Sequence, residues 1–328
     1  MNVLITGGTG FIGSRLALRC ADMGYRVRVL GQENNAAEAD NSKTIEAMGV
    51  NVVRGTVTDR EEVLRAVEGI DVVYHLAAAQ HEMNIPDQKF WDVNVGGTKN
   101  VIDAGIQAGV KRFVHGSTIG VYGAGLNGTI DEHSPLKPNN IYGVTKMEGE
   151  KIVLFHKDKL PVVIIRIPET YGPGDRRLLK LFRTINSFFF MIGKGENLHH
   201  LIFIEDLIDG MLLAGESEAA VGRVFLLSGK EAVTTNEMVA VIADQLGKDA
   251  PKVRVPFWPF YVLATVMEWT LRPLGIQPPL HRRRMDFFKK SFSFSQDESA
   301  RRLGFIPKYG FRDGVKETAR WYVEKGYL

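Results

Sequence analysis

A tyrosine and a lysine four residues apart, Tyr142 and Lys146, form the pair with the clearest chemical potential in this sequence. The surrounding pattern is helical, and residues i and i+4 share a helix face, so the phenol and the ammonium can serve one site. A free tyrosine with a pKa of about 10 is a weak base at neutral pH, but a neighbouring cation favours the phenolate and lowers that pKa. We therefore predict Tyr142 as an acid or base tuned by Lys146, although such a pair alone also occurs on ordinary surface helices.

A segment with two hydroxyl groups lies upstream of this pair. Ser117 and Thr118 follow a β-rich run, and a hydroxyl at such a strand end can hydrogen-bond the reacting oxygen of a substrate. The segment therefore supplies a third candidate for the same site.

The chain opens with a strand-like run that leads into three glycines, Gly7, Gly10 and Gly13. Gly7 permits a tight turn, Gly10 lets a phosphate approach the backbone, and Gly13 lets the next helix lie close to the strand. The helix N-terminus then presents unpaired N–H groups and the positive end of its dipole to the phosphates. The sequence thus predicts a dinucleotide site at its N-terminus.

Strand-like and helix-like runs alternate through the first two thirds of the chain, which predicts an α/β fold with a doubly wound, Rossmann-type parallel sheet. The polar connection Gln32–Asp40 is predicted to be a loop. The predicted strands are Val3–Thr6, Arg26–Leu30, Asn51–Arg54, Val72–Leu76, Arg112–Gly116 and Val162–Ile167. The predicted helices are Ser14–Met23, Lys43–Met48, Glu61–Glu68, Trp91–Ala108 and Val144–Lys157.

The pattern changes after Tyr171, where Gly172-Pro173-Gly174 interrupts the alternation. We predict a dinucleotide-binding domain over residues 1–170 that carries the Tyr142 pair. Residues 171–328 are predicted to form a smaller, mixed, mainly substrate-binding lobe. Some of its elements are expected to return to the first domain, including a strand near Val224–Leu227.

Composition narrows the class of protein. The 328 residues carry a net charge of +3, which gives no electrostatic case for nucleic acid. Cys20 is the only cysteine, so no intrachain disulfide can form, as expected in a reducing compartment. A strand at the N-terminus leaves no room for a signal peptide, and no run of about 20 apolar residues predicts a spanning helix. A cytoplasmic protein with a small-molecule substrate is therefore expected.

In this order, the motifs resemble the extended short-chain dehydrogenase/reductases, the superfamily of nucleotide-sugar epimerases and 3β-hydroxysteroid dehydrogenases, with the NAD-dependent epimerase/dehydratase family among them. Residues 6–13 resemble the family's cofactor turn, and residues 74–78 resemble the strand segment beneath the cofactor. The matching later segments are residues 94–98 (Asn-x-x-Gly-Thr), 166–174 (Arg-x-x-x-x-Tyr-Gly-Pro-Gly, which closes over the nicotinamide) and 203–207.

The resemblance implies that Thr118, Tyr142 and Lys146 are catalytic, that Lys146 also holds the nicotinamide ribose, and that no metal takes part. Ser117 is the alternative to Thr118, but the spacing to Tyr122 favours Thr118. The implied cofactor contacts are Gly7, Gly10, Phe11, Ile12, Gly13, Gln32, Thr56, Val57, Leu76, Ala77, Ala78, Tyr142, Lys146 and Pro168. The expected substrate contacts are Ser117, Asn94, Thr170, His199 and Arg283.

Two residues of these motifs have structural alternatives. His75 is expected to pack beneath the dinucleotide rather than to take part in chemistry. Asn94 could cap the following helix as well as serve the site. The resemblance also implies a homodimer, formed through helices that include the one with Tyr142.

The choice of cofactor stays open between NAD and NADP. An acid at the end of the second strand usually binds the ribose of NAD, whereas an arginine accommodates the 2′-phosphate of NADP. Here Gly31 and Gln32 occupy those positions and Glu33 follows them. An acid near a 2′-phosphate would repel it, so we favour NAD. Near the adenine, Thr56 or Asp59 is expected to replace the family's usual aspartate.

Several residues differ from the motifs of nucleotide-sugar enzymes, and these differences indicate the class of substrate. Nucleotide-sugar dehydratases carry two acids after the threonine, but here Ile119 and Gly120 follow Thr118, so elimination would lack its acid and base. Glu169 stands where nucleotide-sugar enzymes often carry asparagine, and His199-His200 where they often carry arginine. A neutral imidazole binds a diphosphate less firmly than a guanidinium does. These departures favour the 3β-hydroxysteroid dehydrogenase-like branch.

An apolar stretch, residues 257–271, is too short to span a bilayer. It could be a core helix of the second lobe, line an apolar substrate pocket, or lie in a membrane interface. In the last case the basic residues 282–284, 289 and 290 would face anionic lipid, giving a peripheral membrane contact through residues 257–290. The basic cluster 282–284 could instead bind a substrate phosphate.

The leading hypothesis is an NAD(P)-dependent oxidoreductase that transfers hydride between nicotinamide and a secondary alcohol or ketone. The alternative is a nucleotide-sugar (UDP-sugar) 4-epimerase with tightly bound NAD, which resemblance at residues 318–322 also supports. A non-catalytic dinucleotide sensor is the third possibility, but the complete set of Thr118, Tyr142 and Lys146 argues against it.

Overall fold

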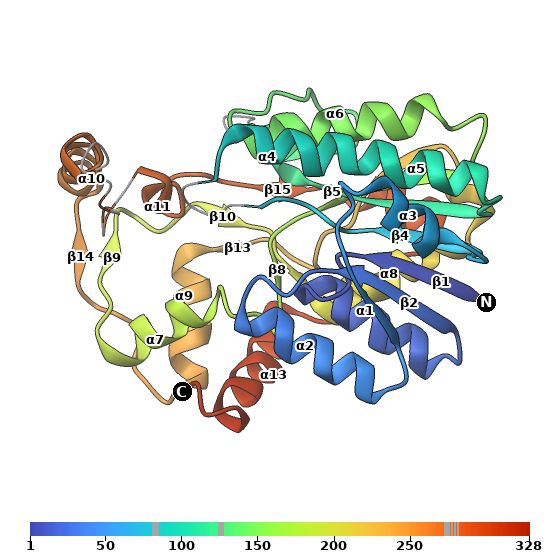
Figure 1. Cartoon of the computed structure of the whole chain (residues 1–328). Coiled ribbons are helices and arrows are strands. Elements are labelled where there is room, and N and C mark those ends of the chain that lie inside the picture. The colour runs from blue at the N-terminus through green and yellow to red at the C-terminus, as the bar shows by residue number, and fades with distance from the viewer. Residues whose placement is uncertain (81–84, 124–127, 272–275, 277, 279, 281) are drawn as a thin grey trace.

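The computed structural model describes residues 1–80, 85–123, 128–271, 276, 278, 280 and 282–328, without the side chains of residues 283 and 284. Figure 1 shows a central sheet with helices on both sides, and beside it a second group of shorter elements. The predicted α/β architecture is confirmed.

Seven parallel strands form the sheet, in the order β12-β7-β5-β4-β1-β2-β3. The switch in strand order between β1 and β4 is the point where a doubly wound sheet opens a crevice at its carboxyl edge. Buried Val and Ile residues dominate these strands, as expected for strands covered on both faces. The strands are β1 (Asn2–Thr6), β2 (Arg26–Gly31), β3 (Asn51–Arg54), β4 (Val72–His75), β5 (Arg112–Thr118), β7 (Val162–Ile167) and β12 (Arg223–Leu226).

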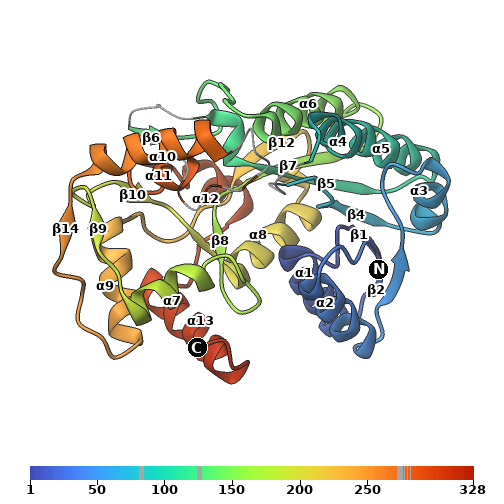
Figure 2. The ribbon, with the colours of Figure 1, turned by 60° about the vertical axis from the view of Figure 1, so that its left-hand side comes forward.

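Two layers of helices cover the sheet (Figures 1 and 2). One layer contains α1 (Phe11–Asp22), α2 (Ala36–Ala47) and α8 (Ile204–Glu216). The other contains α3 (Arg60–Val67), α5 (Thr98–Gln107) and α6 (Ile141–Phe155). Ion pairs from Arg19 to Glu205 and Asp209 tie α1 to α8, so the helix that follows the glycine turn is held against a helix from the later part of the chain.

Two of the predicted boundaries are wrong. The connection predicted as a loop over Gln32–Asp40 contains the first turn of α2, because the Asn35 side chain accepts a hydrogen bond from the Glu38 amide and caps the helix. The single helix predicted over Trp91–Ala108 consists of α4 (Asp87–Trp91), a π-helical turn η1 (Asp92–Gly97) and α5.

Short paired strands and helices build the second group of elements, at the left of Figure 1. Near the sheet's carboxyl edge lie η2 (Ile119–Tyr122), β6 (Thr129–Ile130), β8 (Thr170–Tyr171), β11 (Ile202–Phe203) and β15 (Ser293–Phe294). At the opposite, amino edge, η3 (Glu218–Ala220) lies beside Arg112, the first residue of β5, and α12 (Asp297–Leu303) packs against η3 and β12. The others are α7 (Leu179–Ser187), β9 (Met191–Ile192), β10 (Leu198–His199), β13 (Val233–Thr234), α9 (Thr235–Gln245), β14 (Arg254–Val255), α10 (Phe257–Leu271), α11 (Arg282–Asp286) and α13 (Phe311–Glu324).

Candidate active site

The glycine turn lies at the carboxyl end of β1, where the crevice is expected. Gly7 has a φ of +70°, and a Cβ there would lie 2.7 Å from the Ala77 nitrogen. A Cβ on Gly13 would lie 2.4 Å from the Gly7 carbonyl oxygen. The turn therefore requires glycine at both positions, for backbone conformation and for close packing.

A dinucleotide fits this turn. Gly10 precedes α1 without a side-chain cap, and the first turn of α1 holds no acid. Gly10, Phe11 and Ile12 are partly exposed. The first N–H groups of α1 and its positive dipole end are thus open to a pyrophosphate, and bound NAD or NADP would supply the hydride donor or acceptor.

The opposite end of the predicted cofactor site lies at β2 and β3. The Thr9 hydroxyl donates a 2.7 Å hydrogen bond to the Gln32 carbonyl, which pins the segment that leaves β2. The Glu33 carboxylate accepts a 2.9 Å hydrogen bond from Arg54, which also pairs with Glu46. Asp59 caps α3 through the amides of residues 61 and 62, so Asp59 has a structural role here.

Thr118 and Tyr142 come together because Gly143 lets α6 approach η2. A Cβ on Gly143 would lie 2.5 Å from the Gly120 carbonyl oxygen, and Gly120 itself lies between Thr118 and the Tyr142 ring. Asn140 caps α6 by accepting from the Gly143 amide, which places Tyr142 in the first turn. The side chain of Thr118 hydrogen-bonds the phenol of Tyr142.

The environment of Tyr142 acts on its pKa in opposite directions. Burial is the largest effect and raises the pKa above its ordinary value, whereas hydrogen bonds from Thr118 and Gln80 and the charge of Arg177 act to lower it. The lowering of this pKa by Lys146 that the sequence predicts is not found among the described residues. Arg177 lies at the edge of the site, where its guanidinium donates to the Thr170 carbonyl at 3.0 Å. The sequence analysis did not single out Arg177 or Gln80, because no pattern links either residue to α6.

Lys146 lies one turn deeper on the same helix and is 1% exposed. Burial lowers its pKa to about 8, and the carboxylate of Glu150, a further turn along, opposes that shift. The ammonium is therefore charged at neutral pH and loses its proton as the pH rises through about 8. A ligand that reaches Lys146 meets a cation that is largely shielded from water.

A buried network surrounds the Glu150 carboxylate. It accepts hydrogen bonds from Ser117 Oγ at 2.5 Å and from Arg166 Nε and Nη2 at 3.0 and 2.8 Å. Arg166 also donates to the Tyr122 hydroxyl at 2.9 Å and carries its charge over that ring. The network joins β5, α6 and β7, so it fixes the strand that ends in Thr118 against the helix that carries Tyr142 and Lys146.

Glu150 was not predicted from the sequence, although a signal was present. Glu150 follows Lys146 by four residues and therefore lies on the same face of α6 as Tyr142 and Lys146. Arg166 was quoted only as part of a motif, and its partner could not be read from the sequence.

A second network links the glycine turn to α6. His75 Nδ1 lies 2.7 Å from the Thr6 hydroxyl, and its Nε2 lies 3.0 Å from the Thr98 hydroxyl. Thr98 donates its proton to the Asn94 carbonyl, so Nε2 of the neutral imidazole carries the hydrogen. The Asn94 side chain bonds Ala79 and Thr145 rather than capping a helix. His75 thus packs beneath the site, and burial lowers its pKa to about 3.

The residues expected to contact substrate are engaged within the protein. Ser117 and Asn94 belong to the two networks, and the Thr170 hydroxyl donates to the Pro168 carbonyl. His199 is buried on β10 against Thr235, and burial lowers its pKa to about 4. The side chain of Arg283 lies outside the described residues. Substrate contact by these five residues stays a prediction.

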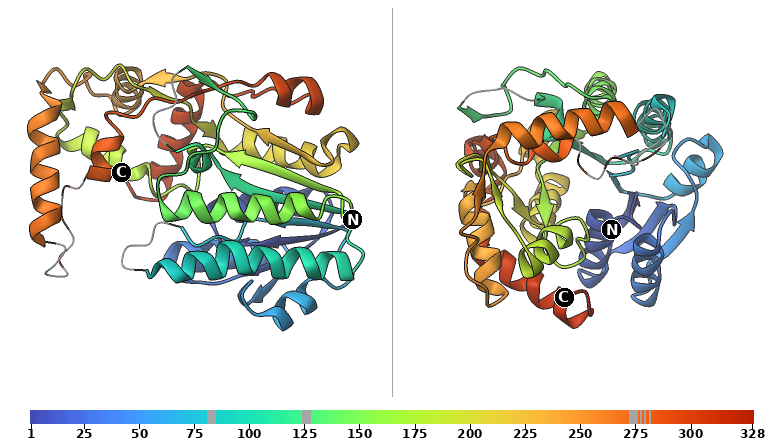
Figure 3. Two further views of the ribbon diagram at one scale, coloured as in Figure 1. Left: turned by 90° about the horizontal axis from the view of Figure 1, so that it is seen from above. Right: turned by 90° about the vertical axis from the view of Figure 1, so that its left-hand side faces the viewer.

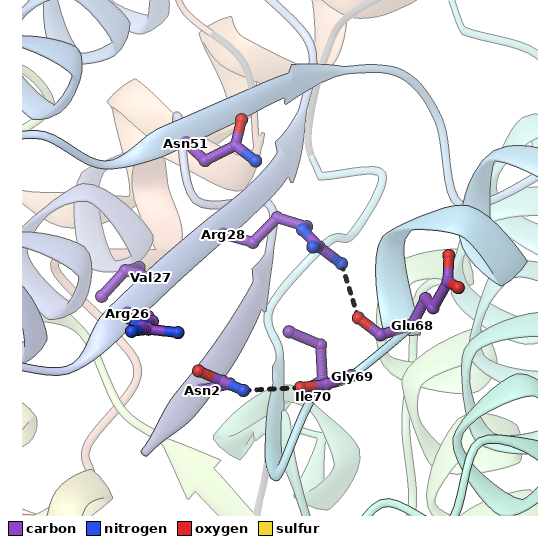
Figure 4. Close-up of a pocket in the computed structure, with 8 residues that line it drawn as sticks. All are labelled: Asn2, Arg26, Val27, Arg28, Asn51, Glu68, Gly69 and Ile70. Carbon is purple, nitrogen blue, oxygen red and sulfur yellow. Dashed lines mark hydrogen bonds between the residues drawn. The ribbon is translucent and has the colours of Figure 1, made fainter.

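A shallow pocket of about 300 Å³ lies at the other edge of the sheet (Figure 4). Asn2 and Arg28 line it, and Arg28 donates to the carbonyls of Ala66 and Glu68 at 2.7 and 3.0 Å. Because the guanidinium already has these partners and the pocket lies at the amino ends of the strands, it is separate from the candidate site.

The fold and site define a dinucleotide-dependent enzyme of the Rossmann type. A profile of the NAD dependent epimerase/dehydratase family matches residues 3–228, and the chain belongs to this family. The family predicted from the motifs is therefore confirmed.

Similar proteins include both kinds of enzyme named in the sequence analysis. A 3β-hydroxysteroid-dehydrogenase/decarboxylase of Arabidopsis thaliana is 28% identical over 96% of this chain, which spans 61% of that relative's length. The sterol-4-alpha-carboxylate 3-dehydrogenase, decarboxylating, of Mus musculus is 28% identical over 96% of this chain and 89% of its own. The UDP-glucuronic acid 4-epimerase of Bacillus cereus, solved with NAD, is 25% identical, with a TM-score of 0.79 and full coverage of both chains.

The Glu150–Arg166 pair gives a prediction for stability. Glu150→Gln leaves the buried Arg166 charge without its counter-ion, and we expect a loss of roughly 3–5 kcal/mol in the free energy of unfolding. Glu148→Gln, on the same helix but in a surface ion pair with Lys151, should change it by less than about 0.5 kcal/mol. Urea unfolding measures both.

The double variant Glu150→Met/Arg166→Met provides the control for this pair. It removes both charges and keeps similar volumes, so much of the lost stability should return. Equal stability of Glu150→Gln and the parent protein would contradict the proposed role of the pair.

His115 gives a second prediction. Its ring is buried 5.4 Å from the ring of His75, and within the described part of the chain neither of its nitrogens has a hydrogen-bond partner. Burial lowers the pKa of His115 well below its usual value. The unfolded chain therefore binds a proton below pH of about 6.5 that the folded protein does not bind, and stability falls as the pH decreases.

His115→Leu should remove this contribution. We expect little change in the free energy of unfolding at pH of about 7.5, and below pH of about 6 a decline that is less steep by about 1.4 kcal/mol per pH unit. His75→Leu is the matched comparison. It removes the hydrogen bonds to Thr6 and Thr98 and should lower the free energy of unfolding by about 1–3 kcal/mol even at neutral pH. An unchanged acid slope in His115→Leu would refute the assignment.

Proposed function

We propose that this enzyme transfers hydride between a nicotinamide cofactor and a secondary alcohol or ketone, as a 3β-hydroxysteroid dehydrogenase-like oxidoreductase. In this proposal Tyr142 passes the proton to or from the substrate oxygen, and Thr118 hydrogen-bonds that oxygen. Lys146 holds the cofactor ribose and keeps a positive charge near the phenol. The proposal rests above all on one observation, the close approach of Thr118 and Tyr142, which both lie next to Gly120 at the sheet edge that also carries the glycine turn.

The proposed alternative is a UDP-sugar 4-epimerase with tightly bound NAD, favoured by the likeness to the Bacillus cereus enzyme. Two observations support the dehydrogenase over it. Glu169 lies between the buried residues Pro168 and Thr170, two residues after β7. Burial raises its pKa, but in its ionised form the Glu169 carboxylate would repel a diphosphate. His199 and His200 are buried and hydrogen-bonded to other parts of the protein, so neither side chain is placed to bind a phosphate.

We further propose that the enzyme is a cytoplasmic homodimer and that residues 257–290 make a peripheral membrane contact. Support for the dimer comes from a hollow of about 430 Å³ on α4–α6, lined in part by Trp91 and Phe155, which are 37% and 78% exposed. The division into a dinucleotide-binding domain over residues 1–170 and a substrate lobe over residues 171–328 is part of the same proposal.

Tyr142→Phe tests the mechanism. With NADH and an apolar cyclic ketone, or with NAD and a 3β-hydroxysteroid, kcat should fall roughly 100-fold to 10,000-fold, because the proton donor is lost. The affinity for NADH, followed by fluorescence, should change little because the glycine turn is intact. Tyr25→Phe, at a surface tyrosine bonded to Glu216, is the matched control and should keep full activity.

The same assays separate the two functions. Net oxidation or reduction of NAD(H) with the ketone or steroid, without conversion of UDP-glucuronic acid, supports the dehydrogenase. Conversion of the UDP-sugar with no net change in NADH would establish the epimerase instead. Full activity of Tyr142→Phe would refute the mechanism for both.

NAD is the proposed cofactor because Glu33 lies at the end of the site expected to bind the adenine ribose and forms an ion pair with Arg54. Glu33→Gln should raise the ratio of kcat/KM for NADP to that for NAD by roughly fivefold, since it removes the repulsion and releases the guanidinium. Glu46→Gln also frees Arg54 from one partner but leaves Glu33 in place, so it should change the ratio less. A parent enzyme that prefers NADP would overturn this proposal.

A further inference from the structure

The helix α10 exposes an apolar face of a kind that a water-soluble surface helix lacks. Trp258, Val262, Leu263, Val266 and Trp269 are 67%, 57%, 49%, 52% and 75% exposed. At about 100° per residue their side chains fall within an arc of about 140° on one side of the helix. The helix lies at the periphery of the molecule, at the left of Figure 1 and the left edge of the first view in Figure 3.

The inner side of α10 is apolar as well and is fully used in packing. Ala264 is buried, and the Phe260 ring lies 5.5 Å from that of Phe190. Glu268 is the only charged residue of the helix; it is 4% exposed and accepts a 2.7 Å hydrogen bond from Arg282. The outer face therefore carries no charge, and the inner contacts hold that face in a fixed orientation.

The segment of the sequence that contains α10 is strongly basic. Residues 252–290 contain eight Lys and Arg against two Asp and Glu, a net charge of +6 in a chain whose total is +3. Lys289 is exposed, with its ammonium 5.9 Å from the Tyr261 ring of α10, and Arg282 is held beside the other end of the helix by Glu268. Lys252 and Arg254 are exposed just before the helix begins.

We propose that the outer face of α10 docks in the interface of an anionic membrane, which gives the membrane contact of residues 257–290 a defined geometry. Its two exposed tryptophans suit the boundary between acyl chains and headgroups, and the surrounding cations suit anionic lipid. The helix is about 22 Å long, shorter than a hydrocarbon core, so it lies along the surface. Among the described residues, no helix is both long enough and apolar enough to cross a bilayer.

A second copy of the chain is a poorer occupant of this face. In a two-fold dimer the same surface is present on both subunits. The cations around α10 would then face the same cations of the other copy and repel them. The rest of the chain has a net charge of −3 and could attract the basic segment. In a dimer that pairs α10 with α10, however, the basic segments face each other instead.

Vesicle co-sedimentation of the full chain tests the proposal. The protein should bind vesicles of about 30% phosphatidylglycerol in phosphatidylcholine, bind phosphatidylcholine alone far more weakly, and lose affinity as NaCl rises from about 0.1 M to about 0.5 M. Trp258→Glu/Trp269→Glu should weaken binding roughly tenfold or more. Ile306→Glu, at a 73% exposed residue outside α10, is the matched control and should bind as the parent protein does.

This inference rests on the proposed function for its membrane contact, but vesicle binding is measured without any catalytic turnover. The two can therefore fail separately. Trp258→Glu/Trp269→Glu should leave turnover of a water-soluble ketone unchanged, because both tryptophan side chains are exposed on the outer face of α10. Undiminished vesicle binding by the double variant, or binding that ignores lipid charge, would overturn the proposal. So would a parent protein that fails to bind vesicles but changes from dimer to monomer in the double variant, which would assign the face to a second copy.

Discussion

The burial of the Lys146 ammonium is the constraint on which the arrangement around the site depends. A cation that is 1% exposed has lost most of its hydration, which is costly unless nearby groups compensate. Glu150 supplies a negative charge one turn away, and Arg166 in turn balances Glu150. The histidines beside Lys146 must then stay neutral, and burial and the lysine charge both lower the pKa values of His75 and His115. Charge placement in the core thus follows from the burial of one lysine.

The same constraint explains why the two halves of the site are mechanically joined. Lys146 can be buried only if α6 packs tightly on the sheet, and Gly149 permits this, since a Cβ there would lie 3.0 Å from the Asn94 carbonyl. Asn94 and Thr98 then connect to His75 and through it to Thr6, the last residue before the glycine turn. The position of α6 and the position of the glycine turn are therefore set by one continuous set of contacts.

Most of the sheet and the outline of the site could be predicted from the sequence, because they depend on local patterns. The strands, the glycine turn and the i, i+4 relation of Tyr142 and Lys146 each depend on residues that are close together in the sequence. The partners of Glu150 could not be predicted, since Arg166 and Ser117 meet it only when β5, β7 and α6 assemble. The first turn of α2 was missed because Asn35 can end a loop or cap a helix, and the Glu38 contact that decides between them is a detail of geometry.

The role of residues 257–271 could not be predicted for a different reason. An apolar run has the same composition whether it fills a core, lines a pocket or meets a lipid surface, and only the surroundings of each face distinguish these cases. Within the described residues, the inner side of α10 is covered by Phe190, Met285 and their neighbours, whereas nothing covers Trp258 and Trp269. A helix that is apolar on both sides, with only its inner side covered by described residues, differs from a core helix, and the exposed side is the basis of the proposed membrane contact. The single acid of the helix points inward to Arg282, and this keeps the outward face free of the charge that would otherwise oppose such a contact.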